Sequence, residues 1–549
     1  MKKRRILSMA LAVAMSASVA VGFSGCGEKT SKTNSSLDPE FLDYLKTAEY
    51  PIQTEETLDC WSYRGGTQYG NHNPAEMPYL KNWEERTGVK VNWTFGSVDV
   101  KQQFSVLIAS GDLPDMVSYM WGVPTDFPGG PERALADGYI TPLNDLIDNY
   151  APNIKAYLDG NEIAEKALKT DSGKYYYIPN YVTTKEKNGN VSNGYVFRKD
   201  WLDDLGLSAP ETIDEWYIAL KAFKEKKGAT APLTIAYSNL SRGLMNPWGI
   251  QLGKMKKDDK IVYGYAEEGY REFLTEMNKW YKEGLLDSNV ATVDSKAIQA
   301  NMLNDKSGAT HQWMSGMRSL ITAGREKNPN YSLVGVRFPV KEKGELPVFG
   351  TRDSMVYNSG FAISEKSTKK ELAMKLIDYG FTNEGRELMS FGVQGETYEI
   401  VNGEYVFTDL IMNNPEGLSL SSAKAVYIRN GENIPTLHID YDEMSEFRGT
   451  YTSKDIYPEI DEALLAWAVA DMETRNKAGA GGTPSNEETS EYARLQTEIS
   501  TYATEMMLKF IVGQEPLENF DAYLAELDKR GLPRYLEMSQ VMYERYKNR

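Results

Sequence analysis

Residues 57–63 read "TLDCWSY" and residues 89–95 read "VKVNWTF". Apolar residues occupy alternate positions of the second stretch, namely Val89, Val91, Trp93 and Phe95. Such alternation is typical of a strand. Between the two stretches, from about residue 74 to residue 86, Met77, Leu80 and Trp83 recur at helical spacing. The three segments together predict a βαβ unit.

The same pattern continues toward the C-terminus. Residues 98–110 predict a helix that ends before Gly111, and residues 112–121, "DLPDMVSYMW", predict a third strand. Strands that alternate with helices indicate an α/β fold with a largely parallel sheet, which binds ligands beyond the carboxyl ends of its strands. Trp61 and Trp121 fall at two such ends.

The predicted elements divide into two lobes. A turn-rich passage before the strand "GYVFR" (residues 194–198) indicates a first crossing between them, and Thr212 with Glu215 predicts a capping box on the helix that follows. We assign residues 51–185 and 350–392 to the first lobe, and residues 186–349 and 393–549 to the second. The C-terminal third is predicted to be helix-rich.

The first 25 residues have the layout of a secretory signal peptide. Lys2 to Arg5 form a basic head, and residues 6–23 carry no charge. The apolar run could span a bilayer, so hydropathy alone leaves a retained signal anchor open. Phe23, Ser24 and Gly25 before Cys26 resemble a bacterial lipobox, which favours cleavage and lipidation of Cys26 with a diacylglyceryl group and an amino-terminal palmitate-type acyl chain.

Residues 26–50 then form the lipidated N-terminus and a polar segment that is predicted to be a flexible tether. Two or three acyl chains anchor a protein firmly. We therefore expect a lipoprotein of the Gram-positive type, held on the extracellular face of the cell membrane.

The composition excludes several classes of protein. The 549-residue chain has a net charge of -17, and loss of four basic leader residues leaves 57 basic against 78 acidic side chains, a net charge of -21. This charge excludes a nucleic-acid binder and leaves the lipid anchor as the membrane contact. Two cysteines and three histidines, without an HExxH or CxxC motif, predict no metal site, and Cys60 is expected to be a buried structural thiol.

Four segments resemble a known family: residues 194–223, 281–287, 359–400 and 506–546. They are similar to the extracellular solute-binding lipoproteins of bacterial ABC importers, in the family 1, LplA-like or oligosaccharide-binding group. The resemblance implies a periplasmic-binding-protein-like clamp with a hinge of several crossings. Such a clamp captures an oligosaccharide between its lobes and passes it to permease subunits.

The chain departs from this family at one point. Several relatives carry an Asp- and Asn-rich calcium loop after the helix that corresponds to residues 212–226. Here residues 224–237 read "KEKKGATAPLTIAY", without the oxygen ligands that calcium requires. We therefore expect neither a metal nor a cofactor.

Residues that could bind a sugar stand in predicted loops and at strand ends. Aromatic rings bind the C–H faces of a sugar, and planar polar side chains bind its hydroxyls. The candidates are Trp61, Tyr63, Arg64, Asn71, Trp121, Trp248, His311, Gln312, Trp313, Arg352 and Asp353. Trp61, Trp121 and Trp313 are predicted to form a stacking platform, although a core position is an equally good interpretation for each tryptophan.

Two other functional classes share parts of this pattern. A carbohydrate-active enzyme would need a pair of carboxylates, but 78 acidic residues make any such pair uninformative, and the chain has no GxSxG motif. A glycan receptor or adhesin without transport would share the anchor and the cleft, and adjacent permease genes would distinguish an importer. The sequence leaves open the sugar, its length, linkage and charge, and a peptide or another polar solute as ligand.

Overall fold

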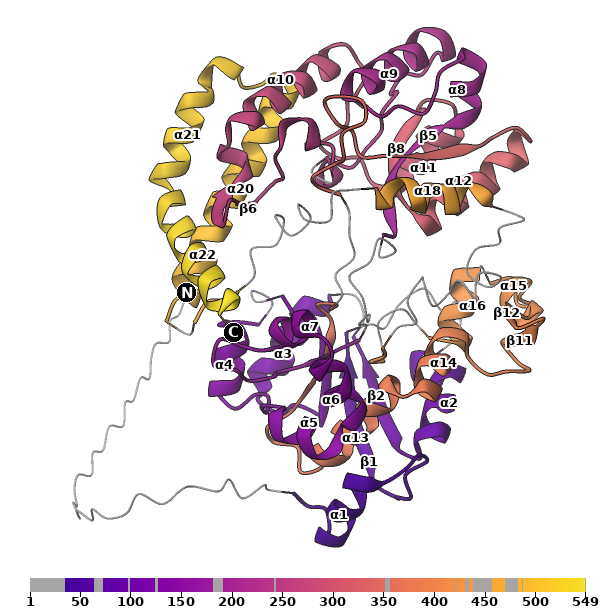
Figure 1. The fold of residues 1–549 in the computed structure, drawn as a ribbon, viewed down its shortest axis with the longest axis vertical. Coiled ribbons are helices and arrows are strands. Elements are labelled where there is room, and N and C mark those ends of the chain that lie inside the picture. Colours follow the sequence, from indigo (N-terminus) through magenta and orange to yellow (C-terminus); the bar gives the residue numbers. More distant parts are fainter. Residues whose placement is uncertain are drawn as a thin grey trace, which may run out of the picture.

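The computed structural model describes residues 35–63, 73–96, 99–123, 127–180, 191–240, 243–350, 356–418, 420–429, 434–437, 457–469, 482–485 and 487–548. Its elements form two lobes, each with its own hydrophobic core (Figure 1). The first core draws on residues 37–178, 356–389 and 425–437, and the second on residues 191–349 and 460–542. The two-lobed α/β architecture expected from the sequence is thereby confirmed.

The first lobe is built on a five-stranded sheet of order β2-β1-β3-β10-β4. The strands are β1 (Thr57–Ser62), β2 (Lys90–Phe95), β3 (Met116–Tyr119), β4 (Ile178–Pro179) and β10 (Gly360–Ile363). Strand β1 is parallel to β2 and β3, and β10 is antiparallel to β3 and β4. Gly360 pairs with both Tyr119 and Pro179, so β10 begins where β3 and β4 end. We call this border, from which β4 leads toward the second lobe, the crossing edge of lobe 1.

Helices cover this sheet and follow the predicted βαβ pattern. They are α1 (Pro39–Thr47), η2 (Pro74–Glu76), α2 (Pro78–Thr87), α3 (Val100–Ser110), α4 (Gly130–Ala136), α5 (Asn144–Tyr150), α6 (Pro152–Asp159), α7 (Glu162–Leu168), α13 (Lys370–Asp378), η6 (Tyr379–Phe381) and α14 (Asn383–Phe391). Trp83 of α2 is fully buried, and α2 and α3 end at Gly88 and Gly111, whose φ angles of 75° and 65° suit glycine.

Residues 39–47 differ from the expected flexible tether. They form helix α1, whose Leu45 is fully buried in the first core, and α1 lies against α5 and α13. Asp38 caps the helix by accepting a hydrogen bond from the Glu40 amide at 2.8 Å. A Pro at the first helical position and this cap favour a helix that the absence of long apolar periodicity obscured.

The second lobe contains a three-stranded sheet of order β8-β5-β9, formed by β5 (Asn193–Arg198), β8 (Ala309–Trp313) and β9 (Leu333–Val336). Both outer strands are antiparallel to β5, so the largely parallel arrangement does not extend to this lobe. The reason is that β5 starts at the crossing, whereas β8 and β9 run back toward it. Asn193 pairs with Trp313, so the start of β5 and the end of β8 share the crossing edge of lobe 2.

The remaining elements of lobe 2 are mainly helices, which confirms the helix-rich C-terminus. They are α8 (Lys199–Leu205), α9 (Ile213–Lys227), η3 (Tyr237–Asn239), η4 (Asn246–Trp248), β6 (Lys254–Lys257), β7 (Lys260–Tyr263), η5 (Gly264–Ala266), α10 (Glu268–Lys282), α11 (Ser295–Leu303), α12 (Met314–Lys327), α18 (Pro458–Ala468), α20 (Thr489–Val512), η9 (Leu517–Asn519), α21 (Phe520–Lys529) and α22 (Leu532–Lys547). The Thr212–Glu215 capping box at the start of α9 is present as predicted.

The segment after α14 belongs to lobe 1, which differs from the expected boundary at residue 393. It forms β11 (Tyr398–Val401), β12 (Glu404–Phe407), α15 (Asp409–Met412) and α16 (Leu420–Tyr427). These elements form a small core around Phe391, and Val426 on α16 joins the first core. As far as the described residues trace the chain, it crosses between the lobes three times, between residues 180 and 191, 349 and 356, and 437 and 457.

Candidate functional site

The two crossing edges are the surfaces that the chain connections hold near each other. The first crossing joins the end of β4 to the start of β5, so it links the two edges directly. The second is shorter, because Phe349 belongs to the second core and Val356 to the first. A chain extends by at most about 3.6 Å per residue, which keeps these two residues within roughly 25 Å. Side chains on the two edges are therefore candidates to contact a common ligand.

The two tryptophans at the edge of lobe 1 are buried, with 7% of Trp61 and 3% of Trp121 exposed. Trp61 lies 6.0 Å from Phe104, measured between ring centroids. The indole nitrogen of Trp121 donates to the Val117 carbonyl at 2.9 Å, and its ring stacks on Phe127. This arrangement differs from the expected stacking platform, because Phe104 of α3 packs on both rings and Phe127 packs on Trp121.

Tyr63 is more accessible than these tryptophans. It follows β1 directly, is half-buried, and meets the Tyr119 ring edge-on at a centroid distance of 6.0 Å. Its position on the crossing edge leaves it the best placed of the expected lobe 1 residues that the structure describes.

The edge of lobe 2 presents one large aromatic side chain to the outside. Trp313, the last residue of β8, is 45% exposed, and the preceding Gln312 is half-buried. The Gln312 amide lies over the start of α12, where a Cβ on Gly316 would come within 2.1 Å of its oxygen. His311 is buried and packs edge-on against Tyr195. Exposure thus decreases from Trp313 inward along β8.

Trp248 lies elsewhere in lobe 2. It belongs to η4, is half-buried, and packs against Phe273 of α10 at 5.4 Å between ring centroids. Arg64, Asn71, Arg352 and Asp353, together with the lipidation candidate Cys26, lie outside the described residues.

Arg318 on α12 is a candidate that sequence reasoning missed. Its Nε is buried and has no hydrogen-bond partner among the residues that the structure describes, and its guanidinium lies 5.8 Å from the ring centre of Tyr457. Burial lowers the pKa of this guanidinium from its ordinary value, and within the described part of the chain no carboxylate pairs with it. An unpaired guanidinium suits a ligand carboxylate or hydroxyl. No sequence pattern distinguishes an unpaired arginine from a paired one.

Cys60 is a free thiol with 1% of its surface exposed, and burial raises its pKa well above the usual value. The expected burial of this thiol is thereby confirmed. Across the described ranges, no three acidic, histidine or cysteine side chains are grouped closely enough to hold a metal ion. Over the same ranges, no helix combines the length and the hydropathy needed to cross a bilayer.

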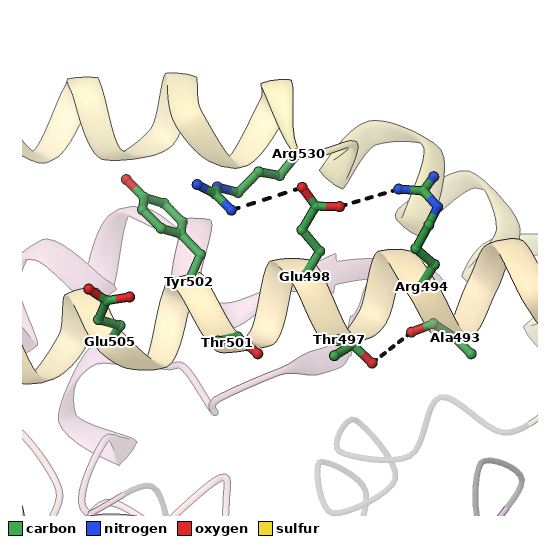
Figure 2. Close-up of a pocket in the computed structure, with 8 residues that line it drawn as sticks. All are labelled: Ala493, Arg494, Thr497, Glu498, Thr501, Tyr502, Glu505 and Arg530. Atoms are coloured by element: carbon green, nitrogen blue, oxygen red, sulfur yellow. Dashed lines mark hydrogen bonds and ion pairs between the residues drawn. The ribbon is translucent and has the colours of Figure 1, made fainter. Parts of the chain in front are cut away.

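A surface groove of about 640 Å³ lies on lobe 2, between α20 and α21, and Figure 2 shows its lining. Glu498 pairs with Arg494 at 3.2 Å and with Arg530 at 3.9 Å, and the Arg530 guanidinium stacks over Tyr502. Because these charges pair with one another and the groove is lined only by C-terminal helices, it does not belong to the crossing edges.

The whole chain is similar to known proteins. The sequence profile of the family described as bacterial extracellular solute-binding protein matches residues 69–387. A fructooligosaccharide ABC transporter substrate-binding protein, FusA of Streptococcus pneumoniae serotype 4, is 24% identical and covers 97% of both chains. Lipoprotein LipO of Bacillus subtilis is 25% identical over 81% of this chain and 84% of its own.

Solved structures share the fold. The alginate-binding protein AlgQ2, determined without calcium ion, is 28% identical and covers 90% of this chain and 100% of its own, with a TM-score of 0.70. An EF-hand mutant of FusA in complex with fructo-nystose is 20% identical at a TM-score of 0.68, with the same coverage. The chain thus has the two-lobed fold of periplasmic binding proteins.

Proposed function

Because this chain belongs to the bacterial extracellular solute-binding proteins, we propose that it captures an oligosaccharide between its lobes and delivers it to the permease of an ABC importer. The observation that carries the proposal is the pair of crossing edges, joined by three crossings, with Trp313 45% exposed beside half-buried Gln312. Relatives described as binding fructooligosaccharide, alginate and polygalacturonan support a carbohydrate ligand.

In the site that we propose, some residues contact the sugar and others lie beneath them and support them. Trp313 stacks on the sugar, and Gln312, Tyr63 and Arg318 bind its polar groups. Arg64 and Asn71, which follow β1 in the sequence, and Arg352 and Asp353 in the second crossing contribute further polar contacts. The buried residues Trp61, Trp121 and His311 shape the edges beneath the ligand, and Trp248 supports α10.

Ligand binding is tested by thermal unfolding against a panel of neutral and uronic oligosaccharides. A ligand that binds only the folded protein raises Tm, by an amount that grows with ligand concentration. We expect at least one oligosaccharide to raise Tm and its monosaccharide to do so less. A panel without any effect, in a protein that unfolds cooperatively, would contradict the carbohydrate proposal.

A glycan receptor that does not transport is the second candidate, because it would use the same site. Uptake of the labelled ligand distinguishes the two candidates. Deletion of the gene should abolish this uptake if the protein serves an importer. Unchanged uptake with lost surface binding would favour the receptor.

A carbohydrate-active enzyme is the third candidate. If the protein only binds, incubation with the oligosaccharide should leave the chain length of that oligosaccharide unchanged.

We propose further that Cys26 is the mature, diacylated N-terminus and holds the protein on the extracellular face of the membrane. The lipobox-like residues before it support this assignment, as does the similarity to a protein described as a lipoprotein. Replacing Cys26→Ala should leave the precursor uncleaved, so that the protein keeps its apolar leader, migrates at a larger size and incorporates no labelled palmitate. Unchanged size and unchanged palmitate incorporation in this variant would contradict lipidation.

A further inference from the structure

Arg545, near the end of α22, makes a direct contact between the two lobes. Its Nε donates to Oδ2 of Asp171 at 2.5 Å. Asp171 belongs to lobe 1, because it lies in the turn between Leu168 and Tyr175, both of which are in the first core. Helix α22 belongs to lobe 2, where it lies against α20, α21 and β7. Figure 1 shows the C-terminus beside α4 of lobe 1.

The other donors of Arg545 fix it to its own lobe. Nη1 and Nη2 donate to the two carboxylate oxygens of Glu488 at 2.9 and 2.6 Å. Nη2 also donates to the Thr483 carbonyl at 3.1 Å. This bidentate pair holds the guanidinium plane in position before any contact with lobe 1 is made. Contact with Asp171 therefore costs little further side-chain entropy.

The environment of the contact strengthens it relative to an ordinary surface pair. The side chains of Asp171, Glu488 and Arg545 are 14%, 23% and 30% exposed. Arg545, through its hydrogen bonds, holds the pKa of Glu488 at about 2, so this carboxylate stays charged near neutral pH. A groove of about 520 Å³ at the same place is lined by residues of both lobes, Asp171 on one side and five residues of α22 and its end on the other.

We propose that Arg545 and Asp171 form an interlobe latch that must break for the lobes to move apart. Three chain segments join the two separate cores, and this ion pair joins the lobes outside those segments. The latch deepens the proposed function, since in a solute-binding protein it would slow the release of the ligand. Arg545 and Asp171 are then positioning residues, which set the lobe arrangement without contacting the sugar.

The lobe arrangement is measured by the distance between two spin labels, in the full chain and without ligand. The labels are carried by Val106→Cys on α3 and Ile218→Cys on α9, which are 64% and 54% exposed. Cys26→Ser leaves Cys60 as the single native cysteine, and Cys60 is buried. We expect Asp171→Asn to lengthen and broaden the distance distribution, because Arg545 keeps its pair with Glu488 but loses lobe 1.

Three further variants control this result. Asp171→Glu keeps the charge and should restore the original distribution. Asp137→Asn breaks the 2.5 Å ion pair with Arg133 inside lobe 1, and should leave the distribution unchanged. Arg545→Lys keeps a charge that can pair with Glu488 but cannot reach both carboxylates, and should open the lobes as Asp171→Asn does. An unchanged distribution in both Asp171→Asn and Arg545→Lys would overturn the latch.

A second measurement separates the latch from the carbohydrate proposal. With an oligosaccharide that raises Tm, the dissociation rate from Asp171→Asn should rise about fivefold, whereas Asp137→Asn should match the unmodified protein. Lengthened distances without any glycan binding would retain the latch and reject the sugar. Glycan binding with unchanged distances and dissociation rate would retain the sugar and reject the latch.

Discussion

The two crossing edges carry the same kind of side chain in different environments. Trp121 follows a strand of lobe 1 and is 3% exposed, whereas Trp313 ends a strand of lobe 2 and is 45% exposed. Both positions are equivalent in the topology, since each lies where a strand reaches the crossings. The two positions differ in the side chains that pack on them, because Phe104 of α3 and Phe127 cover the ring of Trp121. A place at the end of a strand thus does not decide whether an aromatic residue can bind a ligand.

The largest effect is expected at the buried tryptophan. Trp121→Ala removes a buried indole and its hydrogen bond to Val117, which should lower the free energy of unfolding by about 3–5 kcal/mol. Urea unfolding followed by circular dichroism measures the change. The matched control is Leu465→Ala on α18, a side chain that is 67% exposed, for which we expect a change within about 0.5 kcal/mol. A stable Trp121→Ala variant that loses ligand affinity would reverse the comparison and place Trp121 in the site.

The exposed tryptophan should give the opposite result. Trp313→Ala is expected to leave the free energy of unfolding nearly unchanged and to weaken oligosaccharide binding by about 2 kcal/mol, roughly thirtyfold in affinity. Titration calorimetry measures the affinity, and Trp313→Phe, which keeps an aromatic face, should retain most of it. Wild-type affinity in Trp313→Ala would remove the lobe 2 edge from the site.

Much of the fold could be predicted from local patterns. The alternation in residues 89–95, the capping box at Thr212 and the glycine after residue 110 each fix a strand or a helix end through nearby residues. The antiparallel sheet of lobe 2 could not be predicted from local patterns. The direction of β5 relative to β8 and β9 is set by the place where the chain enters the lobe, which nearby residues do not reveal. The placement of residues 398–428 on lobe 1 likewise depends on packing around Phe391.

The candidate site was harder to predict, for a related reason. The burial of Trp61 depends on Phe104 and Tyr119, which are more than 40 residues away in the sequence. Arg318 could not be recognised, because the lack of a carboxylate partner is a property of the folded environment. Sequence identifies residue types that bind sugars, but tertiary packing decides which of them remain accessible.

A smaller effect is expected at Arg318, and it extends the comparison from stacking to charge. Arg318→Gln removes a guanidinium that has no carboxylate partner within the described residues. We expect the affinity for a uronic oligosaccharide to fall about tenfold, or 1.4 kcal/mol, while a neutral ligand loses less. Arg494→Gln, in the surface groove between α20 and α21, is the matched control and should change neither affinity. Equal losses of affinity for both ligands would show that Arg318 does not bind the carboxylate of the uronic ligand.

The smallest effect is expected on the stability of the protein in acid. It concerns a carboxylate of lobe 2 and compares the lobes by a charged pair, not by a buried aromatic ring. The pKa of Glu488, at about 2, lies below its ordinary value of 4.5, so the folded protein binds this proton less readily than the unfolded chain. Its contribution is therefore complete above about pH 5 and is lost as the pH falls toward 2. Solvent screening of this partly exposed pair limits the contribution to about 1 kcal/mol. The Tm difference between the unmodified protein and Glu488→Gln should be constant from pH 7 to pH 5 and should shrink toward pH 3. Because Glu488 and Arg545 belong to lobe 2, the unfolding of that lobe should account for the loss, and a difference that stays constant down to pH 3 would contradict the depressed pKa.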